Sequence, residues 1–197
     1  PFALPVHAQA RASIVIPVYN HFAHTLACLR SIARHPGDAA FEVIVVDDCS
    51  SDETAARLPD IGGLRVLRNA QNLGFIGACN AGAAQARGEY IVFLNNDTAV
   101  TAGWLDALLG TFEARADCGL AGAKLVYPDG RLQEAGGIVF ADGSGWNYGR
   151  YDDPVEVFAW CGGAVLMRPE YLADVGLFDE RFFLYYEDTD LSWRGRA

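Results

Sequence analysis

Three short apolar runs in this sequence each end in a group of polar or acidic side chains that suits a nucleotide and a metal ion. The three groups are Tyr19-Asn20, Asp47-Asp48 and Asn95-Asn96-Asp97. An aromatic ring can stack on a flat base, and a carboxylate accepts hydrogen bonds from imide or amino groups on the base edge. Asp97 offers the oxygen ligand that a hard divalent cation prefers, and a substrate diphosphate would complete the coordination.

Each group also has a simpler interpretation as backbone structure. Asp47 and Asp48 suit the start of a turn and the cap of the next helix. The three residues at 95–97 are ordinary turn formers. Because complementary chemistry follows neighbouring strands, we favour the binding interpretation.

A fourth acidic group, Glu187-Asp188-Thr189-Asp190, lies at a predicted helix start and follows an apolar, aromatic stretch at residues 182–186. Acids at this position commonly cap a helix and complement its dipole. A carboxylate set against aromatic rings also loses hydration, which raises its pKa and makes it a better general base. The group is therefore either a helix cap or the source of a catalytic base.

A glycine-rich segment, residues 74–82, begins another predicted helix, where backbone N–H groups can face a phosphate. It matches neither the G-x-G-x-x-G pattern nor the lysine-bearing phosphate loop, so close packing of a helix on a sheet is the alternative. The aromatic residues Trp146, Tyr148 and Trp160 can stack on sugar faces, or can simply belong to the core.

The elements that must position these groups follow from the apolar pattern. Short β-branched runs without alternation predict strands buried on both faces of a parallel sheet. Strands are expected at 12–18, 42–47, 65–68 and 90–94, and helices at 24–34, after 50–54 and at 74–86. This alternation predicts βαβ units and an α/β fold with a mostly parallel central sheet flanked by helices. Ligands of such sheets bind outside the carboxyl ends of the strands, so the polar groups should converge there.

The pattern changes after residue 103. A helix is expected at 104–112 and a strand at 119–126, whereas residues 128–156 have weak periodicity. We therefore divide the chain into an N-terminal extension at 1–11, a nucleotide-binding half at 12–100 and a mixed acceptor-side and catalytic half at 101–197.

Composition narrows the partners. The 197 residues are 51% hydrophobic and carry a net charge of −10, which fits a globular domain and argues against nucleic acid. The five scattered cysteines fit reduced thiols in the cytoplasm, and no run approaches the roughly 20 apolar residues of a membrane span. The chain lacks an initiator Met and stops as a helix begins, so we expect a domain of a longer protein that is cytoplasmic or at the inner face of the membrane.

With these residues in order, the chain resembles the family 2 glycosyltransferases of the GT-A fold, particularly the bacterial rhamnosyltransferase-like branch that makes cell-surface polysaccharides. The resemblance covers about residues 12–194 and depends on several motifs in sequence. They are Ile16-Pro17-Val18-Tyr19-Asn20, Val46-Asp47-Asp48-Cys49-Ser50-Ser51-Asp52, Asn72-Leu73-Gly74-Phe75, Leu94-Asn95-Asn96-Asp97, Gly162-Gly163-Ala164, Gly176-Leu177-Phe178-Asp179-Glu180 and Tyr186-Glu187-Asp188-Thr189-Asp190-Leu191.

The resemblance implies a donor that is a UDP-, dTDP- or GDP-sugar and an acceptor hydroxyl on a glycan or a lipid carrier. The residues that would bind the nucleotide are Pro17, Tyr19, Asn20, Asp47, Asp48, Asn72, Gly74, Asn80, Asn95 and Asn96. Asp97 would hold Mn²⁺ or Mg²⁺, although Asn95 stands where the family often has its first acid.

For the reaction, the resemblance implies that Asp188, or else Glu187, deprotonates the acceptor hydroxyl and that the sugar is transferred with inversion. Trp160, Gly162 and Gly163 are expected beside the donor or acceptor sugar.

Two other functions share this architecture. A sugar-nucleotide nucleotidyltransferase would need a glycine- and arginine- or lysine-rich loop after the first strand, and residues 19–22 are Tyr-Asn-His-Phe instead. A non-catalytic nucleotide- or carbohydrate-binding module would not require the acids at 97, 187 and 188. The sequence leaves the sugar, the base, the acceptor and the oligomeric state open.

Overall fold

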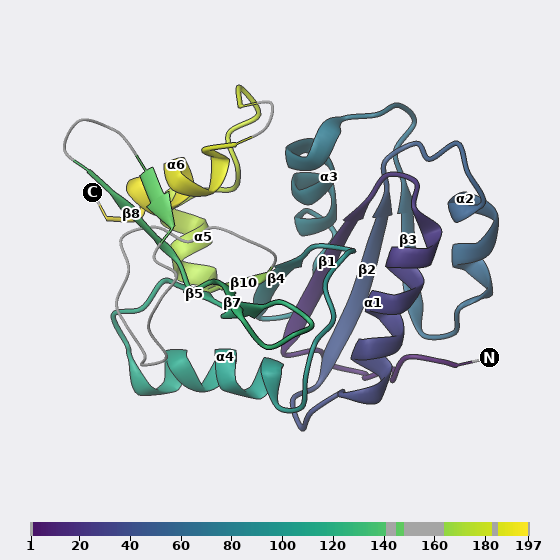
Figure 1. Ribbon diagram of the computed structural model, residues 1–197, viewed down its shortest axis with the longest axis horizontal. Helices are drawn as coiled ribbons and strands as arrows, with labels where there is room; N and C mark the ends of the chain where they lie inside the picture. Colours follow the sequence, from purple (N-terminus) through teal and green to yellow (C-terminus); the bar gives the residue numbers. More distant parts are fainter. Residues whose placement is uncertain (1, 141–144, 148–163, 183–184, 197) are drawn as a thin grey trace.

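The computed structural model describes residues 2–140, 145–147, 164–182 and 185–196 of the chain (Figure 1). A six-stranded sheet forms its centre, with the strands in the order β3-β2-β1-β4-β10-β5. Their bounds are β1 Ala12–Val18, β2 Phe41–Asp47, β3 Leu64–Arg68, β4 Tyr90–Leu94, β5 Leu120–Gly122 and β10 Ala164–Met167. Strands β3, β2, β1 and β4 run parallel, and β10 runs antiparallel to both of its neighbours. The predicted mostly parallel sheet is therefore confirmed.

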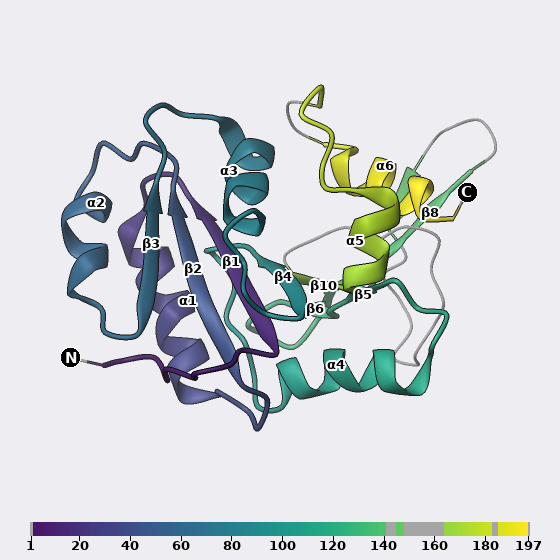
Figure 2. The same cartoon turned by 180° about the vertical axis from the view of Figure 1, so that it is seen from behind.

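Helices cover both faces of this sheet, as expected for a doubly wound fold. They are α1 Phe22–Arg34, α2 Thr54–Arg57, α3 Gly74–Ala83, α4 Trp104–Ala114, α5 Pro169–Val175 and α6 Glu187–Arg194, with a 3₁₀ turn at Leu58–Asp60. The first view looks onto the face that carries α1, and Figure 2 shows the molecule from behind. Within the described residues, no helix is both long enough and apolar enough to span a membrane.

Side chains that alternate along each strand build two separate cores. Ile14, Val43 and Val92 point to one face, where they pack with residues of α1 and α4. Val15 and Phe93 point to the other face and pack with residues of α3 and α6. Every residue of β1 is buried, which confirms that the unalternating apolar run marks a strand covered on both sides.

The region after α4 differs from its prediction. The expected single strand at 119–126 is divided into β5, which joins the central sheet, and β6 Leu125–Val126, which pairs with β7 Leu132–Glu134. The pairing of β5 with β10 ends at Gly122, so the chain leaves the sheet and forms a hairpin with Gly130 at a positive φ of 85°. Strands β8 Gly137–Val139 and β9 Gly145–Asn147 pair antiparallel in a separate two-stranded sheet.

The first residues of the chain pack against the nucleotide-binding half. Ala3 forms a parallel bridge with Gly62, and the Leu4 N–H donates to the Gly62 carbonyl at 2.9 Å. The Leu4 side chain is buried in the same core as α1.

Strand order creates a change of direction between β1 and β4. The chain winds outward from β1 to β2 and β3, then returns to place β4 on the other side of β1. In open α/β sheets, the crevice at such a switch point is the usual ligand site. The polar groups that follow β1 and β4 lie at this point.

Candidate active site

The hydrogen-bond ladder between β1 and β4 stops before the strands end. Pairing of β1 with β2 continues to Val18 opposite Asp47, whereas pairing of β1 with β4 ends at Val15 opposite Phe93. Pro17 lies in the stretch of β1 beyond that point, and proline has no N–H to donate. The sheet is therefore parted at the carboxyl ends of β1 and β4, between Tyr19 on one side and residues 95–97 on the other.

The loop after β1 is fastened to the loop after β2. Asn20 has a left-handed backbone with φ 59°, and its N–H donates to Ser50 Oγ at 2.8 Å. Its side-chain Oδ1 accepts from the N–H groups of Ser51 at 2.8 Å and Asp52 at 3.2 Å. Tyr19, next to this anchor, leaves 51% of its surface exposed, so its ring is accessible for stacking.

Asp47 is buried and fully engaged by protein groups. Its side chain forms an ion pair with Arg68, the last residue of the neighbouring strand β3, and accepts from the Ser50 N–H at 2.9 Å. Arg68 also donates to the Ser50 carbonyl at 3.1 Å. Asp47 thus stabilises the turn after β2.

Asp48 organises the segment that leads into α3. Its carboxylate accepts from Asn69 Nδ2 at 2.7 Å and from the N–H groups of Leu73 and Gly74, each at 2.9 Å. Asn72 Oδ1 accepts from the same Gly74 N–H at 2.9 Å. A carboxylate has about four acceptor positions, and three donors already approach this one. Asp48 therefore shapes the rim of the site, and its contact with a base stays a prediction.

The segment after β4 presents one free-standing carboxylate. The Asn95 carbonyl accepts from Thr98 Oγ1 at 2.7 Å, and Asn96 Nδ2 donates to Thr25 Oγ1 on α1 at 3.0 Å. These bonds leave Asp97 exposed at the edge of the sheet. Burial, assisted by the charge of Asp97, raises the pKa of the Cys28 thiol to about 12, so that thiol stays neutral.

The acid pair at the start of α6, Glu187 and Asp188, is less exposed to solvent than Asp97. Glu187 is only 8% exposed, and its Oε2 has no hydrogen-bond partner among the described residues. Asp188 accepts from the N–H of the next residue, Thr189, at 2.6 Å. Burial raises the pKa of both carboxyls, and the neighbouring charge of Asp188 raises that of Glu187 further. Both therefore hold a proton at higher pH than ordinary acids do.

Two anchors locate this acid pair relative to the sheet. Helix α3 begins at Gly74, which is bonded to Asp48 beyond the end of β2, and by Gly82 it has reached Val15 in the middle of β1. Cys79 lies between these points, and the charge of Glu187 helps to raise the pKa of its buried thiol. Leu191 of α6 also packs in the core that contains Cys79, so α6 lies on the face of the sheet that α3 covers.

Asn80 of α3 forms hydrogen bonds with the segment at residues 178–180, which precedes α6. Its Nδ2 donates to the Phe178 carbonyl at 3.0 Å and to Glu180 Oε1 at 3.2 Å, while its Oδ1 is buried without a partner in the described part of the chain. These contacts position residues 178–180, and binding of a nucleotide by Asn80 stays a prediction.

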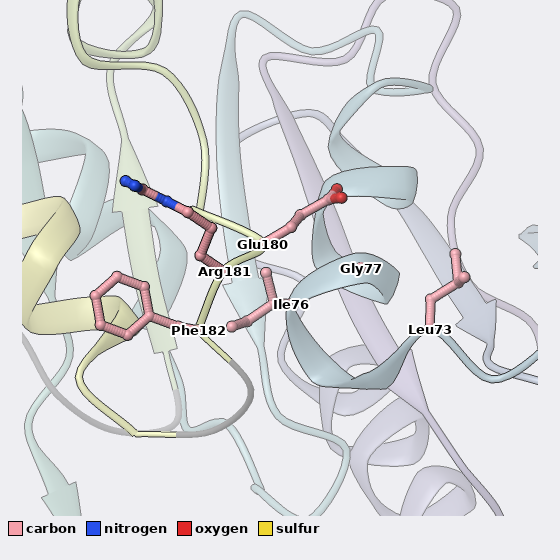
Figure 3. A pocket seen from close by; sticks show the side chains of 6 residues that line it. All are labelled: Leu73, Ile76, Gly77, Glu180, Arg181 and Phe182. Carbon is pink, nitrogen blue, oxygen red and sulfur yellow. The ribbon is translucent and has the colours of Figure 1, made fainter.

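A pocket of about 230 Å³ lies between the start of α3 and the segment before α6. Its lining consists of Leu73, Ile76, Gly77, Glu180, Arg181 and Phe182. In Figure 3, Glu180 points toward α3, whereas Arg181 and Phe182 point away from it. The pocket thus lies between residues 73–77 of the nucleotide-binding half and residues 180–182, which precede α6.

The sequence analysis did not identify the partners of Asp47 and Asp48 or the two tyrosines before α6, and the structure does not describe the expected sugar-binding residues. Arg68 and Asn69 support the two aspartates. Arg68 ends β3 and Asn69 directly follows it, so the rule applied to the other strand ends would have found Asn69. Tyr185 and Tyr186 have left-handed backbones with φ 69° and 68°, which no sequence signal indicates. The expected sugar-binding residues Trp160, Gly162 and Gly163 lie outside the described residues.

Comparison with known proteins adds independent information. The sequence model of Glycosyl transferase family 2 matches residues 13–172. Protein y4gI of Sinorhizobium fredii, which is uncharacterized, is 36% identical over 98% of this chain and 23% of its own length. The O-antigen biosynthesis protein RfbC of Myxococcus xanthus is 30% identical over 98% of this chain and 16% of its own. The chain thus spans less than a quarter of these curated relatives.

A solved structure confirms the architecture. GalNAc-T7, in a crystal structure with UDP, GalNAc and Mn²⁺, superimposes with a TM-score of 0.70 over 96% of this chain and 41% of that one. Sequence identity is 16%, so this likeness concerns the fold alone. The family match includes β1, β2 and β4 with the polar groups at their ends. The chain therefore has the GT-A fold and belongs to glycosyl transferase family 2.

Proposed function

We propose that this chain is the donor-binding and catalytic part of an inverting glycosyltransferase. It transfers a sugar from a nucleotide-diphosphate sugar to a hydroxyl of a glycan or lipid-linked acceptor during synthesis of a surface polysaccharide. The observation that carries the proposal is the acid pair at the start of α6, where Glu187 is buried with an oxygen that has no partner among the described residues, and where burial raises the pKa of both Glu187 and Asp188. Similarity to an O-antigen biosynthesis protein supports the polysaccharide role.

The nucleotide occupies the parted edge between β1 and β4 in this proposal. The half-exposed ring of Tyr19 stacks on the base, in a loop that Asn20 holds in place. Asp48 keeps the 69–74 segment ordered, so that Asn72 and the Gly74 backbone line the same site. UDP, dTDP and GDP all present a flat base and a diphosphate, and all three are candidate donors.

A divalent cation fits the donor set at the end of β4. Among the described residues, no cluster of three or more His, Cys, Asp or Glu side chains could hold a metal ion without help. Mg²⁺ and similar ions are commonly held by one or two carboxylates together with substrate phosphates. Asp97 would supply that carboxylate and Asn95 a neighbouring amide oxygen. Such an ion stabilises negative charge on a departing diphosphate.

The acid pair supplies the proton chemistry. Asp188 in its charged form takes the proton from the acceptor hydroxyl, and the hydroxyl oxygen bonds to the anomeric carbon of the donor sugar. The bond from that carbon to the diphosphate oxygen breaks, and the nucleoside diphosphate leaves with the electron pair. Attack opposite the leaving group inverts the configuration of the anomeric carbon.

Thermal unfolding with added ligands tests the donor part of the proposal. UDP, GDP and dTDP and their sugars are screened with Mn²⁺ or Mg²⁺, each at a series of concentrations. A ligand present at 100 times its dissociation constant adds about 2.7 kcal/mol of stability. We expect one base to stabilise the protein, with metal dependence that Asp97→Ala removes.

The matched control for this screen is Asp117→Ala. Asp117 is an exposed acid that precedes β5, at the amino-end edge of the sheet, and forms an ion pair with Arg115 two residues earlier. This variant should keep the metal-dependent stabilisation. No stabilisation of the wild-type protein by any of these nucleotides would disprove the proposed function. Nucleotide binding without sugar transfer by the intact protein would instead indicate a non-catalytic module.

A further inference from the structure

Two adjacent tyrosines before α6 combine backbone strain with exposure. Tyr185 and Tyr186 have φ values of 69° and 68°, in the left-handed region that side chains larger than glycine seldom adopt. Their side chains are 74% and 57% exposed. Tertiary contacts must hold such a backbone in place, and it is found most often at functional sites.

Packing does not account for these two residues. Within the described part of the chain, neither ring belongs to the two apolar cores of the domain. By contrast, Phe178 and Phe182 of the same segment do contact the core beside α3. Phe178 is buried and Phe182 is half-buried, whereas Tyr185 and Tyr186 are exposed to solvent.

The position of the tyrosine pair is fixed by α6. The Tyr186 carbonyl accepts the N–H of Asp190 at 2.8 Å, so this residue forms the start of the helix. Glu187 and Asp188 follow directly, and burial raises the pKa of both acids. In Figures 1 and 2, the segment that leads into α6 lies across from α3. The rings thus start from the same helix end as the candidate base.

The chemistry of two exposed tyrosine rings beside the candidate base suits the binding of a saccharide. A pyranose ring has an apolar face of C–H groups that stacks on an aromatic ring, and hydroxyls at its rim that a phenol can bond. Two rigid rings also lose little conformational entropy on binding, compared with long flexible side chains. A phosphate or a carboxylate would gain nothing comparable from them and would meet the negative charge of the nearby acids.

We propose that Tyr185 and Tyr186 form the acceptor platform, which stacks on the saccharide unit whose hydroxyl is attacked and sets the preference for that unit. This inference depends on the proposed function, since it assigns residues to the acceptor side of the same site. It gives the tyrosines a binding role and no part in proton transfer.

Saturation-transfer NMR with simple saccharides tests the platform. The intact protein is mixed with UDP, Mn²⁺ and, in turn, the methyl glycosides of glucose, galactose, mannose, rhamnose and N-acetylglucosamine. We expect saturation of at least one glycoside by the wild-type protein and its loss in Tyr185→Ala and Tyr186→Ala. Loss of a central aromatic contact weakens binding by about fivefold or more, as dissociation constants measured by titration will show.

Two sets of variants separate stacking from other effects. Tyr185→Phe and Tyr186→Phe keep the rings and should retain most of the affinity. Tyr127→Ala removes an exposed tyrosine in the β6–β7 hairpin, whose ring contacts Arg131, and should leave glycoside binding unchanged. All variants should keep the nucleotide-induced shift in Tm, because the donor edge is untouched.

The outcomes distinguish the two proposals. Failure of the wild-type protein to bind any nucleotide contradicts the proposed function. With nucleotide binding intact, unchanged glycoside affinity in both alanine variants overturns the platform, as does a wild-type protein that binds none of the glycosides. A lower Tm of the alanine variants in the absence of nucleotide, together with unchanged glycoside affinity, would show that the tyrosines have a structural role. That result would also overturn the proposed platform.

Discussion

The acid pair at the end of β2, Asp47 and Asp48, differs from the acid pair at the start of α6, Glu187 and Asp188, in what surrounds it. Asp47, Asp48 and Glu187 are buried, and Asp188 is half-buried. The carboxylates of Asp47 and Asp48 accept hydrogen bonds from a guanidinium, a side-chain amide and several backbone N–H groups. Glu187 has an oxygen with no partner among the described residues, and Asp188 is bonded mainly to the residue that follows it. Burial without partners favours the protonated form of an acid, whereas donors favour the charged form.

This difference assigns different work to the two pairs. Acids surrounded by fixed donors hold loops in place, because their charge is needed for the bonds they accept. Buried acids with few donors have a raised pKa and bind a proton more tightly once charged, which is what a general base requires. Proximity in the sequence and burial are therefore not sufficient to identify a catalytic acid, and the hydrogen-bond partners decide.

The comparison is tested most strongly by Asp188→Asn. An amide cannot accept the proton of the acceptor hydroxyl, so transfer should fall by about 10²- to 10⁴-fold while the nucleotide-induced shift in Tm persists. Initial rates of sugar transfer by the intact protein measure this. As control, Asp190→Asn changes a carboxylate that Arg194 already engages at 2.8 Å, and should change the rate by no more than about threefold. Transfer at the wild-type rate by Asp188→Asn would remove the distinction between the pairs.

The donor-rich pair should show its effect in stability. Asp48→Ala leaves the Leu73 N–H and the Asn69 side-chain amide without this acceptor, and leaves the Gly74 N–H with Asn72 Oδ1 alone, which should cost about 2–4 kcal/mol of unfolding free energy. For a domain of this size, Tm should fall by roughly 4 to 16 °C. Differential scanning calorimetry measures the change, and Asp117→Ala serves as the exposed control. A Tm within about 2 °C of the wild-type value would show that Asp48 is not needed for the fold.

The pH dependence of transfer should follow the partner-poor pair. The pKa of Asp188 is raised above its ordinary value of 3.8 by burial, and the base must be charged to act. The rate should therefore rise with pH, and the midpoint of that rise should lie above pH 3.8. Single-turnover rates across the range in which the protein stays folded give the profile. A transfer rate that no longer changed with pH above pH 3.8 would contradict the conclusion that burial raises the pKa of the base.

The smallest expected effect is a change in stability in Glu187→Gln. A carboxyl whose folded pKa is raised contributes stability that is complete below its unfolded pKa, near 4.5, and is lost as pH rises through the folded pKa. The glutamine variant stays neutral, so its Tm should exceed that of the wild-type protein by up to about 3 °C at neutral pH. This gain should disappear toward pH 4. A variant that was less stable than the wild-type protein at neutral pH would reveal partners that favour the charged form.

Sequence alone was sufficient for the elements with strong local signals. The buried runs at β1, β2 and β4 have unambiguous β-branched composition, and a parallel sheet brings their ends to one edge. The local pattern predicts a single strand over β5 and β6, because the end of β5 at Gly122 depends on where β10 stops pairing, far along the chain. Local composition contains no information about that partner.

The roles of individual site residues were less accessible. That Asp47 and Asp48 lie at the ligand edge follows from the strand pattern, but their partners come from the segment around residues 68–74. The left-handed backbone at Tyr185 and Tyr186 opposes the intrinsic preference of tyrosine, so the local sequence does not predict it. Such features arise from the folded chain as a whole.

Pro17 has a consequence for the rate at which the donor arrives. Pairing of β1 with β4 already ends at Val15, and a proline further along cannot add a donor to that ladder. The edge is therefore open before any ligand comes, and no strand has to separate first. Association should then be limited by diffusion and orientation, with a single fast phase in stopped-flow traces and no slow conformational phase.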